Sequence, residues 1–164
     1  MNIRKIVSII VVLIWMSIIF GFSNQQGEGS GNTSRKISEV IVKIIDVQNR
    51  YSELEKDKLI ETVEPILRKV AHLTIYAIGG IAIANCVWQF CGKEKITIGM
   101  SAFIGIMYAI SDEVHQLMID GRNGNIKDVI IDSIGILIGI MIFLLIKGVC
   151  KKIVRKKKEC RGGE

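Results

Sequence analysis

The sequence predicts an all-α polytopic membrane protein built as a bundle of four transmembrane helices. Of its 164 residues, 49% are hydrophobic and only one is Pro. A helix needs about 20 mostly apolar residues to cross the ~30 Å hydrocarbon layer, and in lipid only helices or closed barrels satisfy the backbone. The apolar residues lack the alternation of barrel strands and form four blocks: Ile6–Phe22, Val70–Cys91, Ile96–Ile119 and Val129–Ile146.

These blocks divide the chain into one membrane domain, residues 1–149, and a basic tail, residues 150–164. The predicted spans and the loop between the first two are 6–22, 70–91, 96–119, 128–147 and the outer loop 23–67.

The first block also resembles the apolar core of a signal peptide, because Arg4 and Lys5 precede it. We favour a retained span, because the run is long and ends in FGFS (20–23) without the small-residue pattern of a cleavage site.

Basic residues set the predicted orientation. From Lys147 onward the chain has eight Lys and Arg residues, whereas loop 23–67 has six against eight acidic residues. Four spans place both termini on the same side, and the basic bias makes that side the cytoplasm of a bacterial plasma membrane. The net charge of +6 is therefore interpreted as a topology signal, and membrane lipid, not nucleic acid, is the expected partner.

The outer loop begins with a polar segment, residues 23–34, that is too rich in Gly to be expected as a helix. Apolar residues then recur at helical spacing from Ile37 to Ile45, with Ser34 as the expected N-cap, so an amphipathic helix is predicted there. A second short helix is expected from Ser52, where Ser-x-x-Glu forms a capping box. Pro65 is expected in the first turn of the second span.

Polar residues gather at the predicted outer ends of the spans. At about 100° per residue, Arg68, His72 and Tyr76 share an arc of about 80°. Asp128 and Asp132 share a face with a Gly-x-x-x-Gly stripe, which allows a neighbouring helix to approach closely. The candidate site residues are Arg68, Lys69, His72, Tyr76, Tyr108, Asp112, Glu113, His115, Gln116, Arg122, Asp128 and Asp132.

Asp112 lies roughly 10 Å below the predicted outer boundary, at about 1.5 Å per residue. A charge at this depth needs a partner, and we expect Arg68, Lys69 or Arg122 to face it and Glu113. Buried ion pairs that only fix helix packing are the alternative. The whole set favours a functional pocket, because each buried ion costs several kcal/mol and Gly packing would hold the helices at lower cost.

Five segments resemble motifs of the VanZ-like family, whose members are small bacterial membrane proteins: FSNQ at 22–25, RKVAHLTIYAIGG at 68–80, YAISDEVHQ at 108–116, GR at 121–122 and DVIIDSIG at 128–135. The resemblance implies the four-helix fold and a cell-envelope context, since the namesake is associated with resistance to the glycopeptide teicoplanin. It implies roles for the candidate residues above, whereas at Asp132 the family often has Asn.

Three functions remain open. In the first, an enzyme at the outer leaflet holds a lipid-linked cell-wall precursor with Arg68 and Lys69. His115 or His72 then acts as general acid or base, oriented by Asp112 or Glu113. In the second, the same pocket binds or shields an anionic headgroup without chemistry.

The third function is a divalent-metal site. It ranks lowest, and no cofactor is predicted, because Asp-Glu-x-His is not the two-histidine motif of zinc proteases. Its ligands would be His115, Asp112, Glu113, Asp128 and Asp132. The sequence does not indicate an oligomeric state.

Overall fold

The computed structural model describes residues 2–24, 27–46, 51–119 and 124–161, and at 27–33 and 156–161 it describes the backbone alone. These residues form helices, and no strand occurs among them. The five helices are α1 (Ile3–Ser23), α2 (Gly27–Ile45), α3 (Glu53–Cys91), α4 (Glu94–Gln116) and α5 (Ile126–Arg161). The all-α prediction is therefore confirmed.

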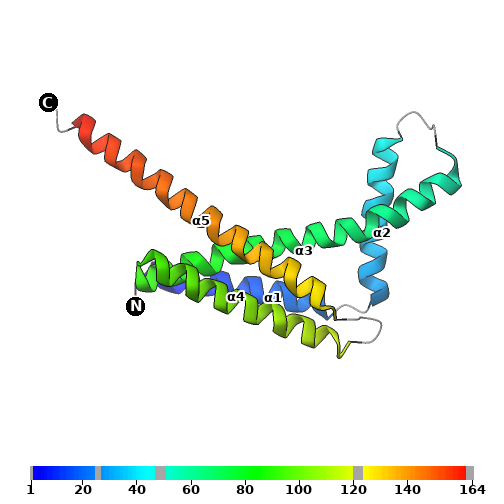
Figure 1. Cartoon of the computed structure of the whole chain (residues 1–164), viewed down its shortest axis with the longest axis horizontal. Coiled ribbons are helices and arrows are strands. Elements are labelled where there is room, and N and C mark those ends of the chain that lie inside the picture. The colour runs from blue at the N-terminus through cyan, green and yellow to red at the C-terminus, as the bar shows by residue number, and fades with distance from the viewer. Residues whose placement is uncertain (1, 25–26, 47–50, 120–123, 162–164) are drawn as a thin grey trace.

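Helices α1, α3, α4 and α5 run alongside one another as a bundle, and α2 stands at one end of it beside the start of α3 (Figure 1). The start of α1 and the end of α5 lie toward the opposite end of the molecule from α2 (Figure 1). The arrangement agrees with a bundle whose termini share one side, while the side of the membrane stays a prediction.

Within the described ranges, three helices are long and apolar enough to cross a membrane, namely α1, α3 and α5. The prediction of four spans is thus confirmed only in part. Helix α4 falls short of the other three because it begins with Glu94 and Lys95 and carries Asp112 and Glu113 in its last two turns. Its length of 23 residues is nevertheless sufficient for a helix to cross the hydrocarbon layer.

The core lies where the four helices meet. It contains Trp15 and Ile19 of α1, Tyr76, Ile83 and Ala84 of α3, Ala109 of α4, and Ile136, Ile140 and Phe143 of α5. Many large apolar side chains instead remain exposed on the outside of the bundle. Such a surface is expected of helices that face lipid, because the hydrocarbon layer itself solvates apolar groups.

Helix α5 packs most extensively against α3, and glycines bring the two backbones together. A Cβ at Gly135 would lie 2.6 Å from the carbonyl oxygen of Leu73, and one at Gly139 would collide with the carbonyl oxygen of Ala77. The predicted Gly-x-x-x-Gly stripe is therefore confirmed as a close helix contact, with α3 as its partner.

The predictions for the outer loop were partly wrong. Helix α2 begins at Gly27, inside the Gly-rich segment expected to be non-helical, and Ser34 lies within it instead of capping it. The hydroxyl of Ser34 donates to Glu64 Oε1 of α3 at 3.0 Å, and Ser38 and Val42 are buried. Tertiary packing of the apolar face outweighs weak local propensity, which allows the helix to extend toward its N-terminus.

The capping box at Ser52 is confirmed, since Glu55 Oε2 accepts from the Ser52 backbone N–H at 2.8 Å. The helix that begins there does not end before the second span, however, and Pro65 lies inside the continuous helix α3. An interior Pro costs about 3 kcal/mol in a helix. Packing on both sides offsets this cost, because Ile60 lies buried before Pro65 and Tyr76 lies buried after it.

An ion pair joins the end of α2 to the first turn of α3. Lys56 Nζ lies 3.1 Å from Glu53 Oε1 and 3.3 Å from Asp46 Oδ2. The hydrogen bonds to Glu53 and Asp46 raise the pKa of Lys56 above its ordinary value.

Candidate functional site

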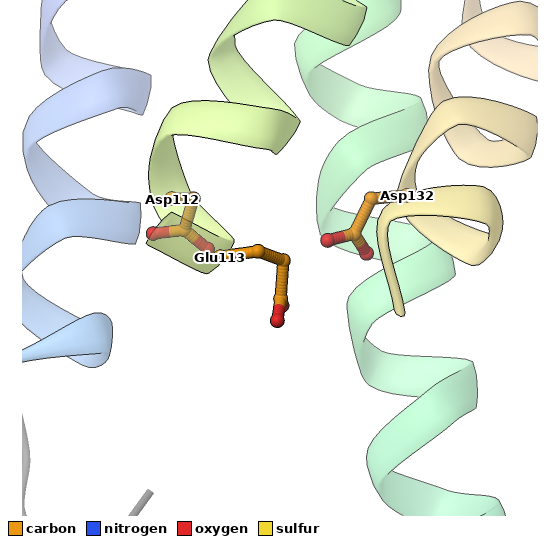
Figure 2. Close-up of side chains that lie close together, drawn as sticks. All are labelled: Asp112, Glu113 and Asp132. Carbon is orange, nitrogen blue, oxygen red and sulfur yellow. The ribbon is translucent and has the colours of Figure 1, made fainter. Parts of the chain in front are cut away.

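The end of the bundle at which α4 stops and α5 starts carries most of the candidate residues; we call it the polar end. Its buried charges come from the last turns of α4 and the first turns of α5. Asp112, Glu113 and Asp132 are all buried. Figure 2 shows Asp112 and Glu113 on α4 and Asp132 on α5, with the Asp132 carboxylate directed toward α4.

Asp112 is the acceptor at the centre of a hydrogen-bond network that joins three helices. Its Oδ1 accepts from Ser23 Oγ of α1, and its Oδ2 accepts from Tyr76 OH of α3 at 3.0 Å and Gln116 Nε2 at 3.0 Å. Gln116 Nε2 also lies 3.2 Å from Ser23 Oγ. Neutral donors therefore stabilise this carboxylate inside the bundle.

Glu113, the next residue along the chain, faces the other side of α4. Its Oε2 accepts the backbone N–H of Asn125 at 2.8 Å, so the acid is bonded to the start of α5. Asn125 is also the N-cap of α5, because its Oδ1 accepts from the N–H of Lys127 at 3.0 Å. One Asn thus caps a helix and binds a buried acid.

His72 of α3 and Asp132 of α5 form a pair, with His72 Nδ1 lying 3.3 Å from Asp132 Oδ1. The close approach at Gly135 makes this pair possible, since it holds the first turns of α5 against α3. From the sequence, Asp112 or Glu113 was expected to orient the candidate general acid or base, His115 or His72. The structure instead places Asp132 beside His72.

His115 lies apart from this pair, on the α1 side of α4. Its Nε2 is 3.2 Å from Asn24 Oδ1, and its ring stacks on Phe20 with the centroids 4.8 Å apart. The structure therefore does not bring His72 and His115 together, although both lie at the polar end.

The two candidate tyrosines also differ. Tyr76 is buried and donates to Asp112, whereas Tyr108 OH donates to the backbone carbonyl of Met16 on α1 at 2.6 Å. Trp15 packs against both rings, with centroids 5.8 Å from Tyr76 and 5.1 Å from Tyr108. Both hydroxyl groups are thus used in contacts between helices.

Arg68 and Lys69 do not face Asp112 and Glu113 as the sequence analysis expected. Arg68 Nη2 lies 3.3 Å from Glu64 Oε1, one turn earlier in α3. A short helix was predicted before Pro65, but not its continuation through Pro65 into the second span. This continuity places Glu64 at i−4 from Arg68. Arg122 lies outside the described residues.

A pocket of about 180 Å³ opens between α3 and the start of α5. It is lined by Pro65, Arg68, Lys69, His72, Asn125, Lys127, Asp128 and Ile131. Lys127 and Asn125 were not among the predicted site residues. The N-cap position of Asn125 was a signal in the sequence, whereas the approach of Lys127 to Arg68 and Lys69 depends on the packing of α5 against α3.

Among the described residues, the pocket is lined by three cationic side chains, Arg68, Lys69 and Lys127, and by one acid, Asp128. His72 belongs to both regions, because it lines the pocket and contacts buried Asp132. The arrangement supplies positive charge for an anion and, at one wall, an imidazole held by a carboxylate.

A family model described as VanZ/LLP1 matches residues 8–147, which is most of the chain. The chain belongs to the VanZ/LLP1 family. The resemblance predicted from the motifs is therefore confirmed. No curated protein and no solved structure matches the chain.

The VanZ/LLP1 match includes all four bundle helices up to residue 147 and therefore every candidate residue. Within this VanZ/LLP1 chain Arg68, Lys69 and Asp128 line the pocket and Tyr108 contacts α1, and the other described candidate residues form three sets. The first is the Asp112 network with Ser23, Tyr76 and Gln116; the second is His72, Asp132 and Glu113 beside the cationic pocket; the third is His115 with Asn24 and Phe20.

Proposed function

We propose that this VanZ/LLP1 membrane protein binds the anionic headgroup of a lipid or a lipid-linked cell-envelope precursor in the pocket between α3 and α5. The observation that carries the proposal is the charge of the pocket wall, where Arg68, Lys69 and Lys127 meet one acid, Asp128. On the predicted topology, this pocket faces the outer side of the bacterial plasma membrane.

The chemistry of the pocket suits a phosphate. The Arg68 side chain remains 50% exposed despite its contact with Glu64, so its guanidinium has donors available for a ligand. A guanidinium matches phosphate oxygens in a bidentate geometry, and lysines add charge without fixing one orientation. The volume of about 180 Å³ has room for several waters, or for a phosphate group in their place.

The surroundings of the pocket favour a ligand that carries a hydrocarbon chain. Ile131 of α5 lines the pocket itself, and Ile66 and Val70 of α3 and Ile130 of α5 have exposed side chains on the same helices. An apolar surface beside a cationic pocket matches a lipid, whose chain lies along the helices while its phosphate enters the pocket.

A lipid-binding measurement tests the proposal. The full chain in nanodiscs of phosphatidylcholine is titrated with a polyprenyl phosphate, and inorganic phosphate alone is titrated in a parallel experiment. We expect Arg68→Ala and Lys69→Ala to weaken binding about 10-fold or more, because a charge-assisted hydrogen bond contributes about 1.5–3 kcal/mol.

Lys58→Ala is the matched control, because Lys58 is exposed on the same helix and does not line the pocket. Wild-type affinity in both pocket variants contradicts the proposal. Equal affinity for inorganic phosphate and the polyprenyl phosphate contradicts the lipid part of it.

A second candidate function is acid–base catalysis on the bound headgroup. The observation that favours it is the His72–Asp132 pair at the pocket wall. A general acid or base contributes typically ~10²–10⁴-fold to a rate. His72→Asn is therefore expected to abolish turnover while leaving the affinity for the lipid phosphate within a few-fold of wild type. An equal loss of affinity instead assigns His72 to binding.

Teicoplanin tolerance supplies the cellular readout. A host that expresses the wild-type chain is expected to tolerate more teicoplanin than one that expresses Arg68→Ala at the same membrane level. Unchanged tolerance in Arg68→Ala separates the pocket from this phenotype.

A further inference from the structure

Three buried carboxylates converge at the polar end, and they come from two helices. Asp112 and Glu113 of α4 and Asp132 of α5 each place one oxygen within 4.8 Å of the other two. Their residues are 5%, 5% and 0% exposed. In Figure 2 the Asp132 carboxylate is directed from α5 toward the two acids of α4.

Several of these oxygens have no hydrogen-bond donor. Within the described part of the chain, Glu113 Oε1 and both carboxylate oxygens of Asp132 accept no hydrogen bond. Asp132 Oδ1 has only the 3.3 Å contact with His72 Nδ1, and Oδ2 has no contact with a basic group among the described residues. A fully buried acid with an unused oxygen directed into the cluster has acceptor capacity that a cation can use.

The protein itself supplies little positive charge to the cluster. Hydroxyl and amide groups donate to Asp112, and a backbone N–H donates to Glu113, so both acids receive neutral donors. The arginine of α3, Arg68, pairs with Glu64. Among the described residues, His72 is thus the basic side chain in contact with the cluster, and one imidazolium cannot balance three carboxylates.

We propose that Asp112, Glu113 and Asp132 hold one divalent cation between α4 and α5. The unpartnered oxygens of Glu113 and Asp132 are its principal ligands, and His72 positions Asp132 as the neighbour of a ligating carboxylate does in known metal sites. The proposal concerns a cation inside the bundle and does not depend on whether the neighbouring pocket binds an anion.

The ligand atoms decide the class of cation. Three carboxylates without a thiolate favour Mg²⁺, Ca²⁺ or Mn²⁺ over zinc or copper. Two oxygens on one ion lie at most two bond lengths apart, which is about 4.6–5.2 Å for Ca²⁺ and about 4.0–4.2 Å for Mg²⁺. The three oxygens lie within 4.8 Å of one another, a limit that falls inside the range for Ca²⁺ and above the range for Mg²⁺.

Metal titration of the untagged full chain tests the site. The protein in detergent is treated with a chelator and titrated with Mn²⁺ alone, bound metal is measured by equilibrium dialysis, and Ca²⁺ and Mg²⁺ are added as competitors. We expect one Mn²⁺ per chain, displaced by Ca²⁺. Asp132→Asn and Glu113→Gln are each expected to weaken Mn²⁺ binding at least 10-fold.

Asp57→Asn is the matched control, because Asp57 is an exposed acid on α3 that takes no part in the cluster. It is expected to bind Mn²⁺ as the wild type does. A second readout guards against loss of folding, since Mn²⁺ should raise the thermal midpoint of the wild type and of Asp57→Asn but not of Asp132→Asn.

Two results overturn the proposal. One is the absence of stoichiometric Mn²⁺ binding by the wild type at millimolar metal, which means that protons and not a cation neutralise the acids. The other is wild-type Mn²⁺ affinity in both Asp132→Asn and Glu113→Gln. Neither result bears on the lipid-phosphate titration, which is carried out without added metal.

Discussion

Asp112 and Glu113 are adjacent in the sequence, equally buried and part of one carboxylate cluster, yet their hydrogen bonds connect them to two different regions. On the α1 side of α4, Asp112 accepts hydrogen bonds from Ser23, Tyr76 and Gln116. On the α5 side, Glu113 and Asp132 keep oxygens without donors among the described residues. The first region is a completed network that holds three helices together, whereas the second has capacity for a ligand.

The largest effect on stability is expected for Asp112, whose two carboxylate oxygens both accept hydrogen bonds. Asp112→Ala removes the common acceptor of three buried donors on three helices. The free energy of unfolding should fall by about 3–5 kcal/mol, because each of the three buried neutral donors loses its acceptor at a cost of about 1–3 kcal/mol. The measurement is unfolding of the purified protein by sodium dodecyl sulfate in mixed micelles.

Asp128→Ala is the comparison for this variant, because Asp128 is only half-buried and lies at the pocket wall. Its free energy of unfolding is expected to stay within about 1 kcal/mol of wild type, the usual range for a more exposed charge. Equal losses in the two variants contradict a special structural role for Asp112.

An intermediate effect is expected from Gly135→Ala, which sharpens the account of the α5 side. A Cβ at this position meets the Leu73 carbonyl oxygen at 2.6 Å, so α5 must move away from α3. Overpacking of this kind costs about 1–3 kcal/mol. The same unfolding titration measures the loss, and the His72–Asp132 contact should lengthen in a structure of the variant.

Gly148→Ala is the matched control, because a Cβ at Gly148 meets no atom within 4 Å. Alanine has a higher helix propensity than glycine by about 1 kcal/mol, so the control should be unchanged or slightly more stable. A similar gain for Gly135→Ala shows that the helices do not approach as described.

The smallest effect on stability is expected for Asp132→Asn. The acid has no hydrogen-bond donor among the described residues, so replacing it removes a buried charge and little bonding. We expect the free energy of unfolding in the absence of metal to change by less than about 1 kcal/mol, in either direction. A loss as large as that of Asp112→Ala, in the same titration, shows that Asp132 belongs to the structural network instead.

The hydrophobic pattern was sufficient to predict the bundle, because apolar blocks of span length leave few alternatives. It did not predict the extent of α2 and α3. Weak local signals at Gly27–Ser34 and at Pro65 were overruled by packing between α2 and α3, which the sequence does not display. Because α3 continues through Pro65, Glu64 and Arg68 lie on the same helix and form a pair.

The candidate site was predicted as a set of residues but not as a set of contacts. The positions of Arg68, His72 and Asp132 along the predicted spans placed them at one end of the bundle. Spacing within one helix does not determine which neighbouring helix each face meets, so the pairing of His72 with Asp132 was not predicted. For the same reason, His115 was expected beside the acids, whereas its face of α4 turns toward Phe20 and Asn24 of α1.

The sequence by itself determined the composition of the polar end, because buried charge is costly and its segregation among apolar residues is visible without coordinates. Tertiary structure alone decided which carboxylates are satisfied. Hydrogen bonding depends on separations of a few tenths of an ångström between helices, and between α3 and α5 the glycines of α5 set the separation by the backbone contacts they permit.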